Sequence, residues 1–156
     1  NKEEYYVFGY GKLQGIYGQA GDAIQAADNY GGVVVDQNQE YIWQRGNRDL
    51  QYKISATSKP VEGLRSELNG GATPMEAISK TFGENALDLS GCKAEQIAYV
   101  MNQGKPVIAV MENKKYVILI GYTETDMTYV EAKNGKSHTV SLEKMDKKAN
   151  GNYIGS

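Results

Sequence analysis

The stretch from Lys105 to Gly135, KPVIAVMENKKYVILIGYTETDMTYVEAKNG, decides the fold. It holds three apolar runs, and a short polar turn separates each run from the next. Runs of β-branched and aromatic residues bounded by turn residues predict neighbouring antiparallel strands. We place these strands at Pro106–Met111, Tyr116–Tyr122 and Met127–Glu131, and a fourth at His138–Ser141. Strands joined in this way, together with the helices predicted on either side, indicate an α+β protein.

Two helices are predicted before this sheet. In TPMEAISKTFG, Thr73 is a natural N-cap, Glu76 completes a capping box three residues later, and Gly83 ends the helix. In LSGCKAEQIAYVMNQG, we expect the helix to begin at Ser90 or Gly91 and to end at Gly104. A last short helix is predicted in SLEKMDKKANG.

The first part of the chain predicts a small lobe with the order β-β-α-β-β over residues 1–46. Its helix is expected to start with Asp22 as N-cap and to end at Gly31–Gly32. The polar stretch that follows is predicted to hold a strand at Leu50–Ser55 and a short helix at Val61–Leu68. We therefore divide the chain into 1–46 and 47–156. The four strands of the lobe are expected at Tyr5–Phe8, Leu13–Tyr17, Val33–Asp36 and Glu40–Gln44.

The bulk composition excludes several classes of function. A net charge of −2 gives no global electrostatic case for nucleic-acid binding. The longest apolar run, Tyr116–Ile120, is far too short to span a bilayer. A single cysteine rules out an internal disulfide, which suits a reducing compartment and also suits surface proteins that avoid cysteine. We expect a monomer, with an extracellular or cell-surface location as the working assumption.

Cys92 and His138 are the only candidates for nucleophilic catalysis. Cys92 is expected in the first turn of its helix, where unpaired N–H groups and the helix dipole lower the pKa of a thiol. His138, the only histidine, could accept the thiol proton in a papain-type dyad. The alternative is a buried structural cysteine and an exposed strand histidine, which is the commoner case because free cysteine is usually buried. One histidine and one cysteine do not make a metal site, and no cofactor motif is present.

Residues 73–154 resemble the papain-like double-glycine leader peptidases of bacteriocin exporters and their stand-alone relatives. The likeness rests on QGKPVIAV, then KYVILIGY, then MTYVEAKNG, in the order and spacing of three successive strands of that family. The resemblance implies a shortened papain-like antiparallel sheet packed on helices, which would occupy 47–156.

The catalytic residues of the family do not carry over. Its histidine stands six residues before the glycine of the Gly-Tyr pair, which is the position of Lys115, and its aspartate falls at Glu131. Lysine is charged at neutral pH and cannot accept the proton as histidine does. The family's nucleophilic cysteine lies at the start of an earlier helix, where this chain has no cysteine and little room for that helix. An ion pair between Lys115 and Glu131 is sterically possible, since their strands are neighbours.

Three functions follow as hypotheses. The first is a non-catalytic relative of leader peptidases, a pseudoenzyme that binds a peptide or protein in a bacterium. The second is an active cysteine peptidase that uses Cys92 with His138. The third is a structural spacer domain of a larger surface protein.

Overall fold

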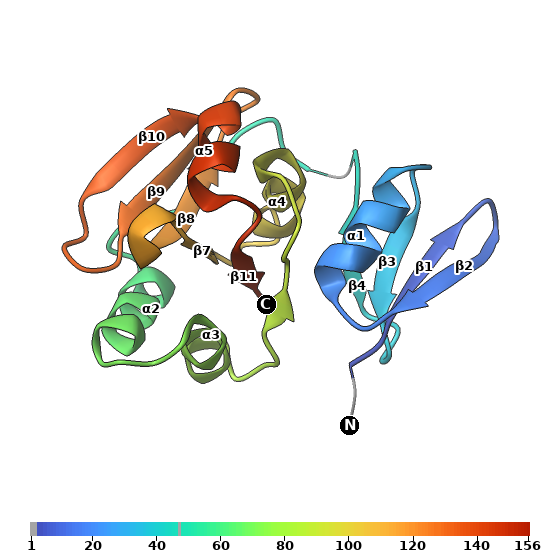
Figure 1. Cartoon of the computed structure of the whole chain (residues 1–156), viewed down its shortest axis with the longest axis horizontal. Helices are drawn as coiled ribbons and strands as arrows, with labels where there is room; N and C mark the ends of the chain where they lie inside the picture. The colour runs from blue at the N-terminus through green and yellow to red at the C-terminus, as the bar shows by residue number, and fades with distance from the viewer. Residues whose placement is uncertain (1–2, 47) are drawn as a thin grey trace.

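The computed structural model describes residues 3–46 and 48–156 and has the predicted α+β class (Figure 1). Helices lie between groups of strands along the chain, and the strands form two separate sheets. The helices are α1 (Ala20–Asp28), α2 (Lys59–Asn69), α3 (Pro74–Phe82), α4 (Ala94–Met101) and α5 (Leu142–Ala149), with a 3-10 turn η1 at Glu112–Lys114. The strands are β1 (Tyr5–Gly9), β2 (Lys12–Tyr17), β3 (Val33–Asp36), β4 (Tyr41–Gln44), β5 (Tyr52–Lys53), β6 (Leu87–Asp88), β7 (Val107–Val110), β8 (Tyr116–Tyr122), β9 (Asp126–Glu131), β10 (Ser137–Ser141) and β11 (Tyr153–Gly155).

The first sheet has the strand order β2-β1-β3-β4, and α1 packs on one of its faces. The helix begins at Ala20 with Gln19 as N-cap, so the predicted cap at Asp22 is wrong; Asp22 lies inside the first turn. The opposite face of the sheet is apolar and open to solvent. Phe8, Leu13 and Ile16 there keep 42 %, 46 % and 52 % of their surface exposed.

The second sheet has the order β10-β9-β8-β7-β11-β6, with β5 pairing beside the end of β8. The sequence pattern predicts the ends of β7, β8, β9 and β10 to within one residue in every case, and both ends of β8 agree with the prediction. It does not predict β11, which enters between β7 and β6 by pairing Tyr153 with Ala109 and Gly155 with Leu87. The last strand of the chain therefore lies inside the sheet rather than beyond it.

The Gly-Tyr pair at the end of β8 fastens the linker that joins the two parts of the chain. A Cβ on Gly121 would lie 2.7 Å from the backbone oxygen of Tyr52, so only glycine allows β5 to approach this closely. The hydroxyl of Tyr122 hydrogen-bonds Asn102 and the backbone oxygen of Asp49, and its ring stacks on Tyr52. The Gly-Tyr pair therefore has a structural role, because it holds the segment around Asp49 and Tyr52 against β8.

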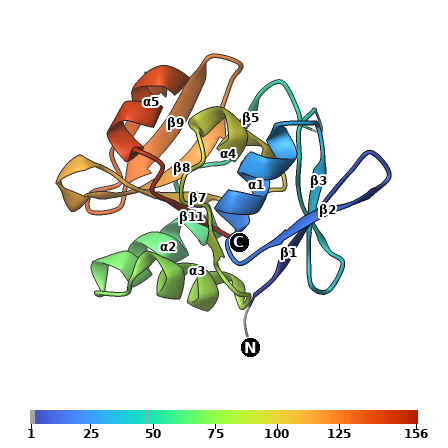
Figure 2. The same cartoon turned by 45° about the vertical axis from the view of Figure 1, so that its right-hand side comes forward.

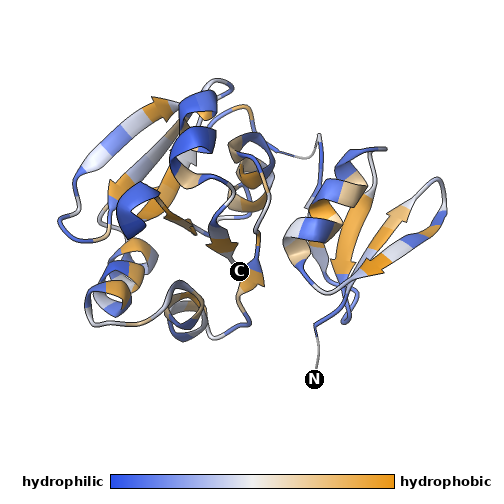
Figure 3. Ribbon diagram, viewed as in Figure 1, coloured by the Kyte–Doolittle hydropathy of each residue, from blue (hydrophilic) through white to orange (hydrophobic). Residues whose placement is uncertain are grey.

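Helices cover both faces of the second sheet. Side chains alternate along β8, so Ile118 and Ile120 pack with α2 and α3, whereas Val117 and Leu119 face the core that contains α4 and α5. The predicted capping box of α3 is confirmed, with Thr73 and Glu76 bonding each other's backbone N–H. Figure 3 shows α5 as mostly hydrophilic, because only one side of it meets the core.

A single apolar core joins the N-terminal sheet to the rest of the chain. Figure 2 shows α1 between the first sheet and α4. A Cβ on Gly21 of α1 would lie 2.1 Å from the backbone oxygen of Ser90, so the helix touches this segment backbone to backbone. Trp43 is fully buried and donates its indole N–H to the backbone oxygen of Gln96 at 3.0 Å. The boundary predicted near residue 46 falls just after β4, and the core continues across it.

Candidate functional site

The strand register brings Glu131 and His138 together. His138 on β10 pairs directly with Tyr129 on β9, and Glu131 lies two residues further along β9 on the same face. A diagonal neighbour at that offset is within reach of a long side chain. The imidazole Nε2 lies 2.7 Å from Glu131 Oε2, and the ring stacks on Tyr129 with centroids 5.1 Å apart. The only histidine of the chain is thus held by Glu131.

The charge of Glu131 is stabilised by its surroundings. The hydrogen bond from His138 lowers the pKa of the Glu131 carboxyl, and the positive charges of Lys115 and Lys136 add to that effect. Both side chains of the pair remain partly open to solvent, with exposed fractions of 33 % for His138 and 20 % for Glu131. His138 and Glu131 are arranged like the base and the orienting carboxylate of a hydrolase. Such a site also requires a nucleophile within hydrogen-bond reach of the base.

Lys115 stands beside this pair without bonding to it. Val117 pairs with Glu131 across the strands, and Lys115 precedes Val117 by two residues, so Lys115 points to the same face at the start of β8. The ion pair with Glu131 that the sequence allows does not form: Glu131 pairs with His138 instead, and Lys115 stays beyond ion-pair distance. Lys115 is exposed and available to solvent.

Two cavities meet at Lys115 and Glu131. The cavity on the α5 side has a volume of about 280 Å³ and is lined by His138, Tyr129 and Lys148 among others. The cavity on the α2 side has a volume of about 620 Å³ and is lined by Asn69 and the turn after β9. They lie on the two faces of the sheet around the start of β8 and the end of β9, and we call the two cavities together the strand-end trough. Its full lining is Leu68, Asn69, Met111, Glu112, Asn113, Lys114, Lys115, Tyr116, Val117, Tyr129, Glu131, Ala132, Lys133, Asn134, His138 and Lys148.

One wall of the trough has a strained backbone. Asn113 and Lys114 in the β7–β8 turn have φ angles of 68° and 59°, in the left-handed region that favours glycine. Asparagine tolerates this conformation and lysine does so less readily. Strain of this kind gathers at ligand-binding and catalytic sites when the surrounding structure enforces it.

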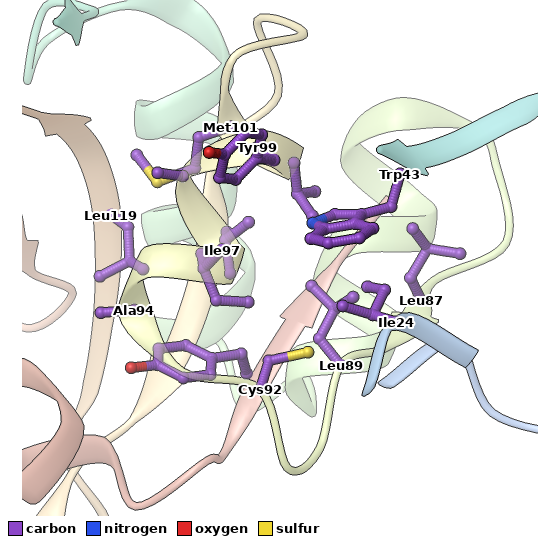
Figure 4. Packing of buried hydrophobic residues seen from close by; sticks show 14 of the residues in the cluster. Ile24, Trp43, Leu87, Leu89, Cys92, Ala94, Ile97, Tyr99, Met101 and Leu119 are labelled. Atoms are coloured by element: carbon purple, nitrogen blue, oxygen red, sulfur yellow. The ribbon is translucent and has the colours of Figure 1, made fainter. Parts of the chain in front are cut away.

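Cys92 lies in the apolar core and does not line the trough. The helix expected to start at Ser90 or Gly91 begins at Ala94, so Cys92 precedes it and gains no helical N–H donor there. Its exposed fraction is 2 %, and Figure 4 shows its side chain pointing into the apolar cluster. Burial raises the pKa of the thiol to about 12, the opposite of the lowering expected at a helix start. The buried structural cysteine is the alternative that this geometry matches.

The helix before α3 also fails to bring a nucleophile to the trough. The sequence suggests little room for it, yet α2 spans eleven residues with Ser58 as N-cap. Its C-terminal residues Leu68 and Asn69 line the trough, and Asn69 donates to the backbone oxygen of Ala132. A helix rises about 1.5 Å per residue, so Ser58 lies about 15 Å further along it. The Ser58 hydroxyl is buried and makes no hydrogen bond among the described residues.

No lining residue of the trough carries a thiol or an aliphatic hydroxyl. Among the residues that the structure describes, no group of histidine, cysteine and acidic side chains could hold a metal ion. Within the same ranges, none of the helices has the length and apolar character needed to cross a membrane. The trough therefore offers charged groups and the aromatic ring of Tyr129, and its lining holds no serine, threonine or cysteine.

Sequence patterns identify only part of the trough. Period-two alternation along β9 places Tyr129 and Glu131 on one face, so the aromatic partner of His138 could have been found from the strand prediction. Lys148 could not have been found in this way, because α5 reaches the trough only through tertiary packing. The left-handed conformation at Asn113 and Lys114 gives no signal either, since no glycine marks it.

Comparison with protein-family models, with curated proteins and with solved structures finds no match.

Proposed function

We propose that this protein is a non-catalytic relative of the papain-like leader peptidases, and that it binds a peptide or protein segment in the strand-end trough. The observation that carries the proposal is the composition of the trough. It is lined by the residues at the family's histidine and aspartate positions, Lys115 and Glu131, and by no thiol or aliphatic hydroxyl. A binding site that has lost its nucleophile is consistent with both facts.

The shape of the trough suits an extended chain. It follows the ends of two neighbouring strands and has an aromatic floor in Tyr129, with polar side chains on both sides. Extended peptides are recognised partly through pockets that take their alternate side chains. The stacked ring of His138, fixed by Glu131, is pre-organised for contact and loses little freedom on binding.

An active peptidase that uses Cys92 with His138 has weaker support. A thiol with a pKa raised to about 12 is almost wholly protonated at neutral pH, and the thiolate is the nucleophile. The side chains that influence the pKa of the thiol are Gln25, Asp22, Asp28 and Asp88, and His138 is not among them. A peptidase mechanism would require both side chains to move into a different arrangement.

The test is to incubate the protein with a library of short random peptides, to separate retained from free peptides by gel filtration, and to identify both by mass spectrometry. We expect a subset of peptides to be retained, all of them intact. His138→Ala should lower this retention, since it removes the stacked ring from the trough. Thr139→Ala is the matched control, because it lies on the same strand and its hydroxyl bonds Thr128 on the opposite face.

Two results would contradict the proposal. Peptide cleavage that disappears in Cys92→Ala or His138→Ala would show an active peptidase. Retention that is equal in His138→Ala and in the wild type would place any binding outside the trough.

A further inference from the structure

The strand-end trough is ringed by lysines that lack ionic partners. Lys114, Lys115, Lys133 and Lys148 line it, and Lys136 acts on Glu131 from the next turn. Within the described residues, none of these five lies within ion-pair distance of a carboxylate.

Only two carboxylates share this region with the five lysines. Glu131 already accepts the hydrogen bond from His138, which leaves Glu112 as the other acidic side chain of the lining. The whole chain has a net charge of −2, so the trough concentrates positive charge on an acidic protein. A concave site lined by one sign of charge attracts ligands of the other sign.

Lys148 is the most informative member of this ring. It lies in the last turn of α5 and is only half exposed, whereas its neighbour Lys147 points outward and lies 3.9 Å from Glu143. Among the described residues, no carboxylate lies within ion-pair distance of Lys148. Its ammonium group can therefore pair with a carboxylate of a ligand in the trough.

We propose that the ligand of the trough is an acidic peptide segment in extended conformation, with its Asp or Glu side chains directed at Lys115 and Lys148. Alternate side chains of an extended peptide point to the same side, with a spacing of about 7 Å. A peptide that is acidic at every second residue can therefore place successive carboxylates along the trough while its backbone lies over Tyr129. This inference rests on the proposed function and adds the chemical class of the ligand.

The test uses fluorescence anisotropy with labelled, C-terminally amidated peptides of repeating Gly-Glu and of repeating Gly-Gln. We expect the Gly-Glu peptide to bind more tightly, and its affinity to fall as ionic strength rises from about 0.05 to 0.3 M, since salt screens exposed charges. Lys115→Gln and Lys148→Gln should each weaken its binding by about two- to fivefold, the range for one exposed ion pair.

Lys147→Gln is the matched control, because it makes the same change on the next residue of α5, outside the trough. It should leave the affinity within experimental error. An equal loss of affinity for the Gly-Glu peptide in Lys147→Gln and Lys148→Gln would contradict the proposed site. It would show that the peptide is attracted by the net charge of the protein alone. Thermal unfolding of each variant checks that the fold is intact.

Three further binding measurements test the acidic character of the ligand separately from peptide binding itself. If the Gly-Gln peptide binds as tightly as the Gly-Glu peptide, the acidic ligand is wrong and peptide binding stands. If a Gly-Gln peptide with a free C-terminus matches the Gly-Glu peptide, the site reads a terminal carboxylate, which contradicts the inference. Tighter binding of a single-stranded DNA oligonucleotide than of the Gly-Glu peptide would also overturn it.

Discussion

Single residues decide where this chain can and cannot do chemistry. Val117 on β8 pairs with Glu131 on β9, and Lys115 lies two residues before Val117, so Lys115 and Glu131 both reach the trough. Lys115 brings a positive charge beside Glu131, and a lysine ammonium is a compact point charge. The sequence alone places these two residues on neighbouring predicted strands. It does not show that His138 would occupy Glu131, because that contact depends on the register of β10 against β9.

Cys92 should be unreactive in the folded protein. Its exposed fraction of 2 % and its raised pKa both reduce the concentration of accessible thiolate. We expect a thiol reagent such as DTNB to label it slowly at pH 8 in buffer and rapidly in concentrated urea. Labelling in buffer at the rate of the unfolded chain would contradict this placement of the side chain.

Gly121→Ala should destabilise the fold. The added Cβ would meet the backbone of Tyr52 at 2.7 Å, and a backbone cannot move aside as a flexible side chain can. Overpacking of this kind costs about 1–3 kcal/mol of unfolding free energy, measured by urea denaturation. Gly18→Ala is the control, since a Cβ there meets nothing within 4 Å. Equal stability of the two variants would show that β5 does not need the glycine.

At the scale of elements, local signals fix some boundaries and tertiary contacts fix others. The capping box of Thr73 and the left-handed Gly83 bound α3 where the sequence predicts. The start of α4 differs, because Asp146 from α5 accepts the N–H of Ala94 at 2.7 Å. That cap comes from a residue far along the chain, so a prediction from the neighbouring sequence places the start of α4 too early. The strand β11 has three residues, too few for any periodicity to be recognised.

Alanine at the N-caps of α2 and α3 should change the stability of the protein by different amounts. Thr73 accepts the N–H of Glu76, so Thr73→Ala should cost about 1 kcal/mol of unfolding free energy. The Ser58 hydroxyl is buried and bonds nothing among the described residues, so Ser58→Ala should be neutral or slightly stabilising. Urea denaturation of both variants measures the difference. A loss at Ser58 as large as that at Thr73 would mean that its hydroxyl caps α2 after all.

At the scale of the whole molecule, the two sheets are held together by a core and by one polar cluster at its rim. Asp28 of α1 bonds Arg45 after β4 and Gln96 of α4. The hydrogen bond from Arg45, aided by the one from Gln96, lowers the pKa of the Asp28 carboxyl against the effect of its partial burial. The sequence predicts both parts of the chain separately, and it does not reveal this junction because its members lie far apart in sequence.

The junction should weaken in acid. A carboxyl whose folded pKa lies below its unfolded value of about 3.9 adds stability that is present above that value. This stability is lost as the pH falls through the folded pKa. Asp28→Asn should cost about 1–3 kcal/mol at pH 7, and the gap from wild type should close below about pH 4. Urea denaturation across pH 3–7 measures it. A gap that stays constant to pH 3 would contradict the shifted pKa.

Non-catalytic peptide binding in the strand-end trough is the central claim, and amide chemical-shift mapping tests it most directly. The labelled protein would be titrated with a peptide retained from the random library. The account predicts shifts centred on Lys115, Glu131 and His138, with the peptide still intact at the end of the titration. Shifts confined to other parts of the molecule, or peptide fragments accumulating in the spectrum, would contradict it.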